Sequence, residues 1–301
     1  MRPLYITGPT GSGKSAIAAT LAHRIGGEVV NADACQLYRN LEIVTAAPTI
    51  EQRRLAPHHL YGCLDVNEDC NAAHYAELAR PVVNEIIQRG SFPVVVGGSG
   101  LYMKSLTHGL DDLPAADHQL RKKLDVLTLE QLVARLRQLD PDAAVKLNLS
   151  NRRYVTRAVE ISILADRPMS EIKTSWQNSS PDFDGIMINW DRDVLYSRIN
   201  RRVNEMMAGG LTEEISQLPK ALSATAAKAI GIREIKSHLA GERTVEQCIE
   251  SISQASRRYA KRQLTWFKKE PGFQMVCLKQ AEDTDSVIMR ILALHPRPGH
   301  A

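Results

Sequence analysis

Residues 8–15 of this chain read Gly8-Pro9-Thr10-Gly11-Ser12-Gly13-Lys14-Ser15. They fit the pattern G-x-x-x-x-G-K-[ST], in which backbone N–H groups surround a phosphate chain, the lysine reaches its outer phosphates and the hydroxyl binds Mg²⁺. The apolar segment 1–7 before it predicts a buried strand, and segment 16–25 after it predicts a helix. Strand, loop and helix in this order are the context in which the pattern binds phosphate. We therefore prefer a phosphate loop to a chance match in a glycine-rich turn.

Strands and helices alternate in the first third of the chain. Segments 28–32 and 92–96 predict further strands, and segment 72–89 between them predicts a helix. This alternation predicts a parallel sheet, which binds ligands at the carboxyl ends of its strands. The phosphate loop, Asp33 after the second strand and the turn at 97–100 after the third should therefore meet at one edge of the sheet.

A second, helical part of the chain begins near residue 111. Segment 111–117 predicts a hinge, and polar helical segments follow it as far as residue 164. Residues 186–190 predict a strand that returns to the sheet, after which we expect only helices and a disordered tail at 295–301. The expected fold class is α/β: a P-loop NTPase-like parallel sheet flanked by helices, formed by 1–111 and 186–301, with a small all-helical insertion domain at 112–185.

The composition is that of an ordinary globular protein. The 301 residues are 44% hydrophobic and 24% charged, with no apolar run long enough for a membrane helix and no signal-peptide pattern at the start. We therefore expect a cytoplasmic protein without a membrane segment. The five cysteines form no C-x-x-C pair, which favours reduced thiols over a zinc site. The net charge is +4, and positive charge gathers in the second half.

The phosphate loop lacks the partner that nucleotide hydrolysis needs. A P-loop ATPase or GTPase holds Mg²⁺ with an additional Asp at the end of a nearby strand. Strand 92–96 ends instead in Gly97-Gly98, and Asp65, after segment 61–64, is a weaker substitute. The pattern therefore disfavours hydrolysis and favours another role, such as holding a diphosphate leaving group.

Asp33 and Ser99 are the candidate catalytic side chains at this edge. A carboxylate close to a phosphate loop suits a general base, although Asp is also common as a helix N-cap. The glycines around Ser99 would let a ligand approach the backbone closely, and its hydroxyl can donate or accept a hydrogen bond. Alternatively, Ser99 caps a helix in a tight turn. Both interpretations of each residue stay open at this point.

Two basic segments suggest contact with nucleic acid. Arg153 and Arg157 are spaced to share one face of a helix. Segment 257–269 holds six Lys or Arg side chains and three aromatic ones. Positive charge neutralises phosphates and aromatic rings stack on bases, so we favour RNA binding. The alternative is a solvated helix face with Trp266 and Phe267 in the core.

Taken together, these motifs resemble those of the tRNA dimethylallyltransferases, also called tRNA isopentenyltransferases. The resemblance runs nearly from end to end and depends on the order of several segments. They are GPTGSGKS at 8–15, NADACQLYR at 31–39, VGGSGLYMKSL at 96–106, NRRYVTRAVEI at 151–161, RVNEMMAGGLTEEI at 202–215, AIGIRE at 229–234 and RRYAKRQLTWFKK at 257–269.

This resemblance implies transfer of a dimethylallyl group from dimethylallyl diphosphate to N6 of adenosine 37 in tRNAs that read codons beginning with U. It implies that Asp33 is the general base and that Ser99, where the family usually has threonine, contacts the target nucleotide. With Mg²⁺ on Ser15, the diphosphate would be bound by Gly8, Thr10, Gly11, Ser12, Gly13, Lys14 and Ser15, and by Lys228 and Arg233. The anticodon stem-loop of tRNA would contact Asp33, Ala34, Cys35, Gln36, Ser99, Arg121, Arg153, Arg157, Arg258, Lys261 and Arg262. We expect a monomeric protein of bacterial type.

The chain departs from the family pattern in three places. Lys228 stands where many members have arginine, so a bidentate contact with diphosphate would be lost and Arg233 could share the task. Segment 44–49 lacks a glycine and a lysine of the usual pattern, and the insertion is short. Two alternative functions are retained: prenyl transfer to a free adenine nucleotide, and a P-loop ATPase-type module that binds nucleic acid.

Overall fold

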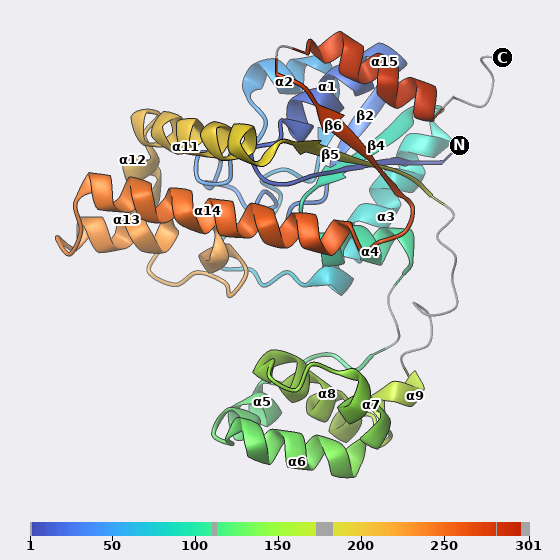
Figure 1. The fold of residues 1–301 in the computed structure, drawn as a ribbon, viewed down its shortest axis with the longest axis vertical. Helices are drawn as coiled ribbons and strands as arrows, with labels where there is room; N and C mark the ends of the chain where they lie inside the picture. The colour runs from blue at the N-terminus through green and yellow to red at the C-terminus, as the bar shows by residue number, and fades with distance from the viewer. Residues whose placement is uncertain (1, 110–112, 173–182, 281, 296–301) are drawn as a thin grey trace. The chain divides into compact units, whose positions relative to one another are not determined.

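The chain forms two compact units. The computed structural model describes residues 2–109, 113–172, 183–280 and 282–295 (Figure 1). The first unit joins Met1–Thr107 to Pro181–Ala301, and the second is His108–Ser180. The second unit begins and ends a few residues before the insertion expected at 112–185. The predicted tail at 295–301 lies almost entirely outside the described residues.

A six-stranded parallel sheet, in the order β3-β2-β4-β1-β5-β6, forms the centre of the first unit. The strands are β1 (Leu4–Thr7), β2 (Gly27–Asn31), β3 (His58–His59), β4 (Phe92–Gly97), β5 (Asp184–Trp190) and β6 (Phe273–Leu278). β1 lies between β4 and β5, with Thr7 opposite Gly97, while Asn31 at the end of β2 lies opposite Val96. The carboxyl ends of β1, β2 and β4 are therefore neighbours, as the alternation predicted, and the α/β fold class is confirmed.

The expectation that only helices follow residue 190 was wrong. β6 is an additional strand at the edge of the sheet, paired in parallel with β5. It was missed because an edge strand has one neighbour, and Gln274, Met275 and Cys277 remain exposed, which breaks the apolar pattern of a buried strand. The two-residue strand β3 was also missed, since it carries only two half-buried histidines.

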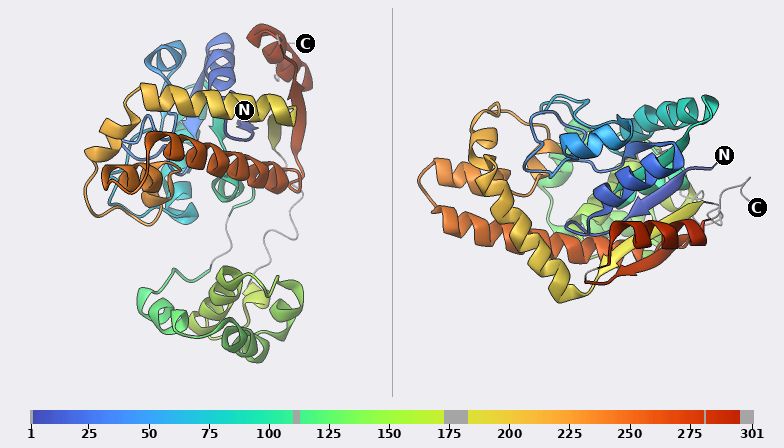
Figure 2. Two further views of the ribbon diagram at one scale, coloured as in Figure 1. Left: turned by 60° about the vertical axis from the view of Figure 1, so that its left-hand side comes forward. Right: turned by 90° about the horizontal axis from the view of Figure 1, so that it is seen from above.

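Helices cover both faces of the sheet. They are α1 (Lys14–Ile25), α2 (Ile50–Leu55), α3 (Ala72–Gln88), α4 (Gly100–Thr107), α11 (Arg192–Ala208), α12 (Leu211–Ser216), α13 (Ile232–Leu239), α14 (Val245–Phe267) and α15 (Thr284–Leu294), with a 3₁₀ turn at Ala226–Lys228. α1 packs beside α15 over an apolar core that includes Ile6, Val94 and Ile186 (Figure 2). α11 leads away from β5, and α14 returns beside it towards β6 (Figure 1).

The phosphate loop has the local structure that its sequence predicts. It connects β1 to α1, which begins at Lys14, two residues earlier than expected. Gly13 precedes the helix with φ 85°, a left-handed conformation that favours glycine. No side chain caps this end of α1. The amides of the first turn are therefore left for a ligand, where the helix dipole favours an anion.

The second unit is a bundle of short helices with its own core. It contains α5 (His118–Asp125), α6 (Leu129–Leu139), α7 (Pro141–Lys146), α8 (Arg152–Leu164) and α9 (Met169–Ile172). Leu132, Leu136, Val155 and Val159 are fully buried at its centre. None of the described helices in either unit is both long and apolar enough to span a membrane.

A buried carboxylate organises the entry to this bundle. The fully buried Glu160 side chain accepts hydrogen bonds from Arg121 (2.9 Å), Arg157 (2.7 Å) and the Asp117 backbone N–H (3.0 Å). Burial by itself would raise the pKa of Glu160, but the hydrogen bonds from Arg121 and Arg157 outweigh it and hold the pKa below its usual value. Glu160 therefore joins α8 to α5 as an ionised group.

Glu160→Ala should destabilise the second unit by about 2 kcal/mol. This is below the range for a fully buried pair because both guanidinium groups reach solvent and can rehydrate. Hydrogen exchange of the α8 amides should speed up accordingly, while amides of β1 and β4 in the other unit keep their protection. The control Glu171→Ala removes an exposed carboxylate of α9 and should leave α8 unchanged. Equal protection in both variants would contradict a structural role for Glu160.

Candidate functional site

Helix α11 supplies two arginines to the phosphate loop that the sequence analysis did not select. Arg202 donates a hydrogen bond to Thr10 Oγ1 (2.6 Å), and Arg198 donates to the Gly11 carbonyl (2.9 Å). Trp190 at the end of β5 donates its indole N–H to the Ser12 carbonyl (2.9 Å). The Arg198 guanidinium also lies over the Trp190 ring, 4.6 Å from its centre. The phosphate loop is therefore next to two arginines of α11 in addition to its own Lys14.

Two polar groups of this site lack a partner within the described part of the chain. Ser12 Oγ and Arg202 Nε are buried, and neither makes a hydrogen bond there. Burying an unpaired hydroxyl or guanidinium N–H is costly, so such atoms suggest that a ligand completes the site. Phosphate oxygens accept hydrogen bonds from both kinds of group, so a diphosphate fits this donor set.

The surroundings of Lys14 disfavour the charged form of its side chain. Burial lowers its pKa to about 8, with a further decrease from the Arg202 charge, while the Asp33 carboxylate acts in the opposite direction. Arg202 is subject to the same balance, because burial lowers its pKa and Asp33 raises it. Asp33 thus lies close enough to influence both cations. The sequence prediction that Asp33 meets the phosphate loop is consistent with this arrangement.

Asp33 follows β2 in a tight turn. Its backbone N–H donates to Asn31 Oδ1 (2.8 Å), and its Oδ1 accepts from the Cys35 N–H (3.1 Å). Residues 34–37 form turns and not a helix, so the alternative that Asp33 caps a helix does not hold. Within the described residues, this turn gives a hydrogen bond to only one of the two carboxylate oxygens, and the Asp33 side chain is partly exposed.

Two tyrosines near Asp33 were missed by sequence reasoning. Burial raises the pKa of Tyr61, and the Asp33 charge raises it further. The Tyr61 hydroxyl is buried and has no hydrogen-bond partner in the described ranges. Burial and then the Asp33 charge also raise the pKa of Tyr259 in α14, while the neighbouring Ser99 side chain acts in the opposite direction. Two largely buried phenol groups therefore lie near the Asp33 carboxylate.

Ser99 connects two turns. Its Oγ accepts a hydrogen bond from the Ala34 N–H (2.9 Å), and its carbonyl accepts from the Met103 N–H (3.0 Å) at the start of α4. Ser99 therefore precedes a helix, as the structural alternative supposed, and also lies beside Asp33 and Tyr259. Its contact with a target nucleotide stays a prediction.

The glycines on both sides of Ser99 are explained by protein neighbours. A Cβ on Gly98 would overlap the side-chain amide of Gln263, and a Cβ on Gly100 would overlap the ring of Trp266. Both neighbours belong to α14. Packing against α14 therefore explains these two glycines without a ligand, and close approach of a ligand to this backbone stays a prediction.

The remaining predicted diphosphate residues differ in their surroundings. The Thr10 N–H and hydroxyl are already bonded, to Gln263 and Arg202. Lys228 is exposed and lies near Cys35. Burial raises the pKa of the Cys35 thiol to about 12, and the Lys228 charge acts in the opposite direction. Arg233 is 85% exposed and pairs with Glu234 at 2.9 Å. Of the two candidates left open for the diphosphate, Lys228 is the one that contributes charge to this region.

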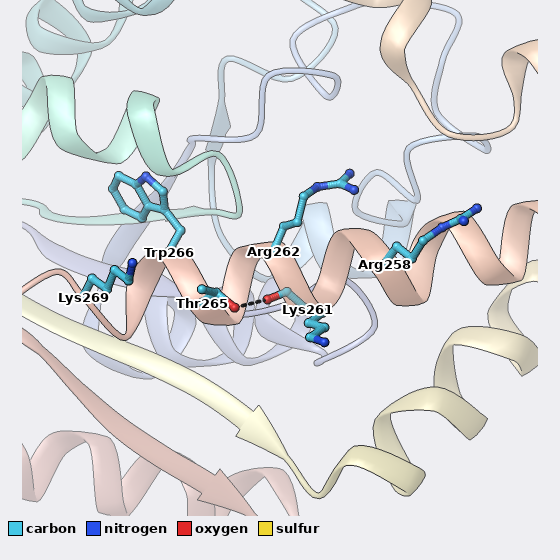
Figure 3. Close-up of a pocket in the computed structure, with 6 residues that line it drawn as sticks. All are labelled: Arg258, Lys261, Arg262, Thr265, Trp266 and Lys269. Carbon is cyan, nitrogen blue, oxygen red and sulfur yellow. Dashed lines mark hydrogen bonds between the residues drawn. The ribbon is translucent and has the colours of Figure 1, made fainter. Parts of the chain in front are cut away.

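The basic segment 257–269 covers the last turns of α14 and the two residues that follow the helix. Six residues of it line a pocket: Arg258, Lys261, Arg262, Thr265, Trp266 and Lys269 (Figure 3). Arg258, Arg262 and Trp266 project to the same side of the helix (Figure 3). Phe267 is fully buried and contacts the Phe273 ring, so the alternative of core packing is confirmed for this residue. Trp266 remains available at the pocket.

Other predicted RNA-binding residues have internal partners. Gln36 donates to the carbonyls of Thr45 and Ala46, which ties the turn after Asp33 to the segment with the altered family pattern. In the second unit, Arg121 and Arg157 bind Glu160, whereas Arg153 is exposed. Arg157 also donates to the Pro114 carbonyl. Contact of these residues with tRNA stays a prediction, and Arg121 and Arg157 have a structural role besides.

Asp65, the weaker candidate for a second Mg²⁺ carboxylate, pairs with Arg39 at 3.2 Å, with both side chains half exposed. Among the residues that the structure describes, no three His, Cys, Asp or Glu side chains gather in a group suited to a metal ion. A Mg²⁺ ion at the phosphate loop would therefore depend on Ser15 together with phosphate and water oxygens. Mg²⁺ commonly binds in this way.

Comparison with known proteins gives a consistent result. Residues 36–270 match the model of the family described as IPP transferase, and residues 1–56 match isopentenyl transferase. A tRNA dimethylallyltransferase of Geobacter metallireducens is 38% identical over 98% of this chain and 97% of its own length. A tRNA dimethylallyltransferase of Geobacter sulfurreducens is 41% identical over 91% of both.

Solved structures of tRNA prenyltransferases are also similar to this chain. The full-length tRNA isopentenylpyrophosphate transferase of Bacillus halodurans is 35% identical, with a TM-score of 0.71 over 96% of this chain and 94% of that one. A eukaryotic dimethylallyltransferase acting on tRNA has a TM-score of 0.84 at 26% identity, covering 97% of this chain and 77% of its own. The similarity therefore extends over both units of the chain.

The depressed pKa of Lys14 predicts that binding of inorganic diphosphate weakens above pH 8. The free protein loses the Lys14 proton there, while a bound anion would favour the protonated form. Above pH 8 the affinity should therefore fall by up to about tenfold per pH unit relative to Lys14→Arg, whose guanidinium stays charged. Calorimetric titrations at pH 7, 8 and 9 measure this ratio, which cancels the ionisation of diphosphate itself. A constant ratio would show that Lys14 does not titrate in this range.

Proposed function

The chain belongs to the IPP transferase family, and from this premise we propose that the tRNA prenylation it catalyses is transfer of a dimethylallyl group from dimethylallyl diphosphate to N6 of adenosine 37. The acceptors would be tRNAs that read codons beginning with U. The observation that carries the proposal is the position of Asp33, whose charge acts on Lys14 of the phosphate loop and on Tyr259 of the basic helix. A carboxylate near both residues would lie between the bound diphosphate and the docked RNA.

The reaction exchanges one bond for another. Adenine N6 attacks C1 of the dimethylallyl group, the C1–O bond breaks and diphosphate leaves with the bonding electrons. The N6 proton passes to Asp33, which acts as general base. Lys14 and Arg202 would stabilise the negative charge that develops on the diphosphate, and the free amides at the start of α1 would hold its oxygens. No water attacks, so a carboxylate that orients a hydrolytic water is not required.

Mg²⁺ would assist at the same place. The Ser15 hydroxyl would hold it, and most of its other ligands would be phosphate and water oxygens, as its preference for hydrated octahedral sites allows. When bound, the ion would neutralise charge on the departing diphosphate. Lys228 would add a further positive charge from the side of Cys35.

The tRNA would dock on α14. Arg258, Lys261 and Arg262 are exposed and line its pocket with Trp266. These cations would neutralise phosphates of the anticodon stem-loop, and the target adenosine would leave the base stack to reach Asp33. Tyr259, Ala34, Cys35 and Ser99 surround the place where that base would enter. We propose that the enzyme acts as a monomer, since this arrangement of Asp33, phosphate loop and α14 comes from one chain.

The direct test is formation of N6-dimethylallyladenosine. Purified protein with dimethylallyl diphosphate, Mg²⁺ and a tRNA with adenosine at position 37 should yield this nucleoside, detected by mass spectrometry after digestion. Asp33→Asn should lower the rate at least a hundredfold, because the amide cannot accept the N6 proton, while tRNA affinity is kept. Asp65→Asn makes the same change on the surface and should be as active as wild type. Absence of product with a competent tRNA would overturn the proposal.

The salt dependence of binding separates tRNA from a free adenine nucleotide. Each phosphate contact that is lost should reduce the slope of log K against log salt by about one. Lys261→Gln and Arg262→Gln should each have this effect on tRNA binding, whereas Arg192→Gln, an exposed change on α11, should not. If salt and these variants leave tRNA affinity unchanged and free adenine nucleotides are prenylated, the acceptor is a nucleotide.

A further inference from the structure

Gln263 connects the two halves of the site. It lies on α14 with only 4% of its surface exposed. Its amide oxygen accepts a hydrogen bond from the Thr10 N–H of the phosphate loop (2.8 Å), and its amide N–H donates to the Gly98 carbonyl (2.9 Å). A single planar group therefore joins the loop that would hold the prenyl donor to the turn that carries Ser99.

The local structure is built around this bridge. Gly98 has no positive φ, so its backbone conformation does not call for glycine. Its lack of a side chain is instead explained by space, because a Cβ there would overlap the Gln263 amide. Thr10 gives its N–H to Gln263 and not to a ligand, although neighbouring amides of such loops bind phosphate. The bridge thus uses a donor that the site could have used for binding.

The same helix carries the surface on which RNA would dock. Lys261 and Arg262 are the residues just before Gln263 and are exposed. Tyr259, one turn earlier, lies near the Ser99 side chain, and Trp266, one turn later, occupies the space beside Gly100. The acceptor-binding helix, the phosphate loop and the Ser99 turn are therefore held together within two turns of α14.

We propose that Gln263 is a positioning residue for the transfer reaction. By holding Thr10 and Gly98 on one amide, it fixes the separation between the bound diphosphate and the place where the adenine N6 would lie beside Asp33. This inference rests on the proposed function. The displacement needs the two reacting atoms at close approach and in line, and a displacement of about 1 Å can cost a hundredfold in rate. Binding of either substrate alone does not require that separation to be correct.

Two substitutions separate the two hydrogen bonds. Gln263→Glu has nearly the same size and can still accept from the Thr10 N–H, but its carboxylate cannot donate to the Gly98 carbonyl. Gln263→Met fills similar space and makes neither bond. Gln247→Glu is the matched control, because it makes the same chemical change on the exposed first turn of α14. Circular dichroism and thermal unfolding identify any variant that fails to fold.

Gln263→Glu should bind inorganic diphosphate and tRNA within about threefold of wild type but lower kcat at least tenfold. Gln263→Met should lower kcat as much and also weaken diphosphate binding about fivefold or more, because the phosphate loop loses its tether. Gln247→Glu should match wild type in all three measurements. A kcat close to wild type in both Gln263 variants would overturn the proposal, as would equal losses of diphosphate affinity in both.

The pH dependence of kcat distinguishes a lost hydrogen bond from a loss of packing around residue 263. Protonating the carboxyl introduced in Gln263→Glu restores a donor towards the Gly98 carbonyl, and burial should raise the pKa of that carboxyl. The kcat of this variant relative to wild type should therefore rise as the pH is lowered from 8 to 6, while the relative kcat of Gln263→Met stays flat. A flat ratio for Gln263→Glu would contradict the role of the donated hydrogen bond.

Diphosphate binding by a variant of Gly98 tests the same pair of hydrogen bonds without measuring catalysis. Gly98→Ala should displace the Gln263 amide and weaken diphosphate binding as Gln263→Met does, and the double variant should be no weaker than either alone. Additive losses would mean that the two residues act separately and would overturn the bridge. If wild type and Gln247→Glu form no prenylated tRNA, the proposed function fails, while this binding cycle still decides whether Gln263 tethers the loop.

Discussion

The electrostatic cost of holding Lys14 and Arg202 together is the constraint around which the first unit is organised. Both cations are partly buried beside the phosphate loop, and the Arg202 charge lowers the pKa of Lys14. Asp33 is the carboxylate that acts in the opposite direction on both. A site with two partly buried cations, one nearby carboxylate and open helix amides favours a polyanion as ligand. An uncharged ligand would gain little from this electrostatic attraction.

This constraint explains why the site is assembled from distant segments. The phosphate loop follows β1 and Asp33 follows β2, while Arg202 comes from α11 and Gln263 from α14. The register of the parallel sheet brings the ends of β1, β2 and β4 together. Helices α11 and α14 then cover the same edge and provide the charge and the hydrogen bonds that the loop cannot make within itself. The site thus depends on packing between elements more than on any one motif.

Helix α14 combines functions that the sequence presents as one basic segment. Its exposed side carries cations and Trp266, its buried side carries Gln263 and Phe267, and Tyr259 reaches Ser99. The second unit shows a similar division. Arg121 and Arg157 belong to an internal ion pair with Glu160, whereas Arg153 stays at the surface. A cluster of basic residues in a sequence therefore does not reveal how many of its charges remain available to RNA.

Local patterns determined much of this protein: the phosphate loop, the strand before it, the helix after it and the placement of Asp33 at the end of β2 follow from short-range periodicity and glycine positions. The same patterns predicted the α/β class and the family. They missed β6, because an exposed edge strand loses the apolar pattern of a buried one.

The tertiary structure alone decided the roles of Arg198, Arg202, Tyr61 and Gln263. Each acts on a residue far away in the sequence, and no local spacing encodes such a contact. It also decided that Gly98 and Gly100 make room for α14, since the space that a missing side chain leaves is filled only when the helices pack. The sequence thus determined which chemistry is present, and packing determined which atoms face one another.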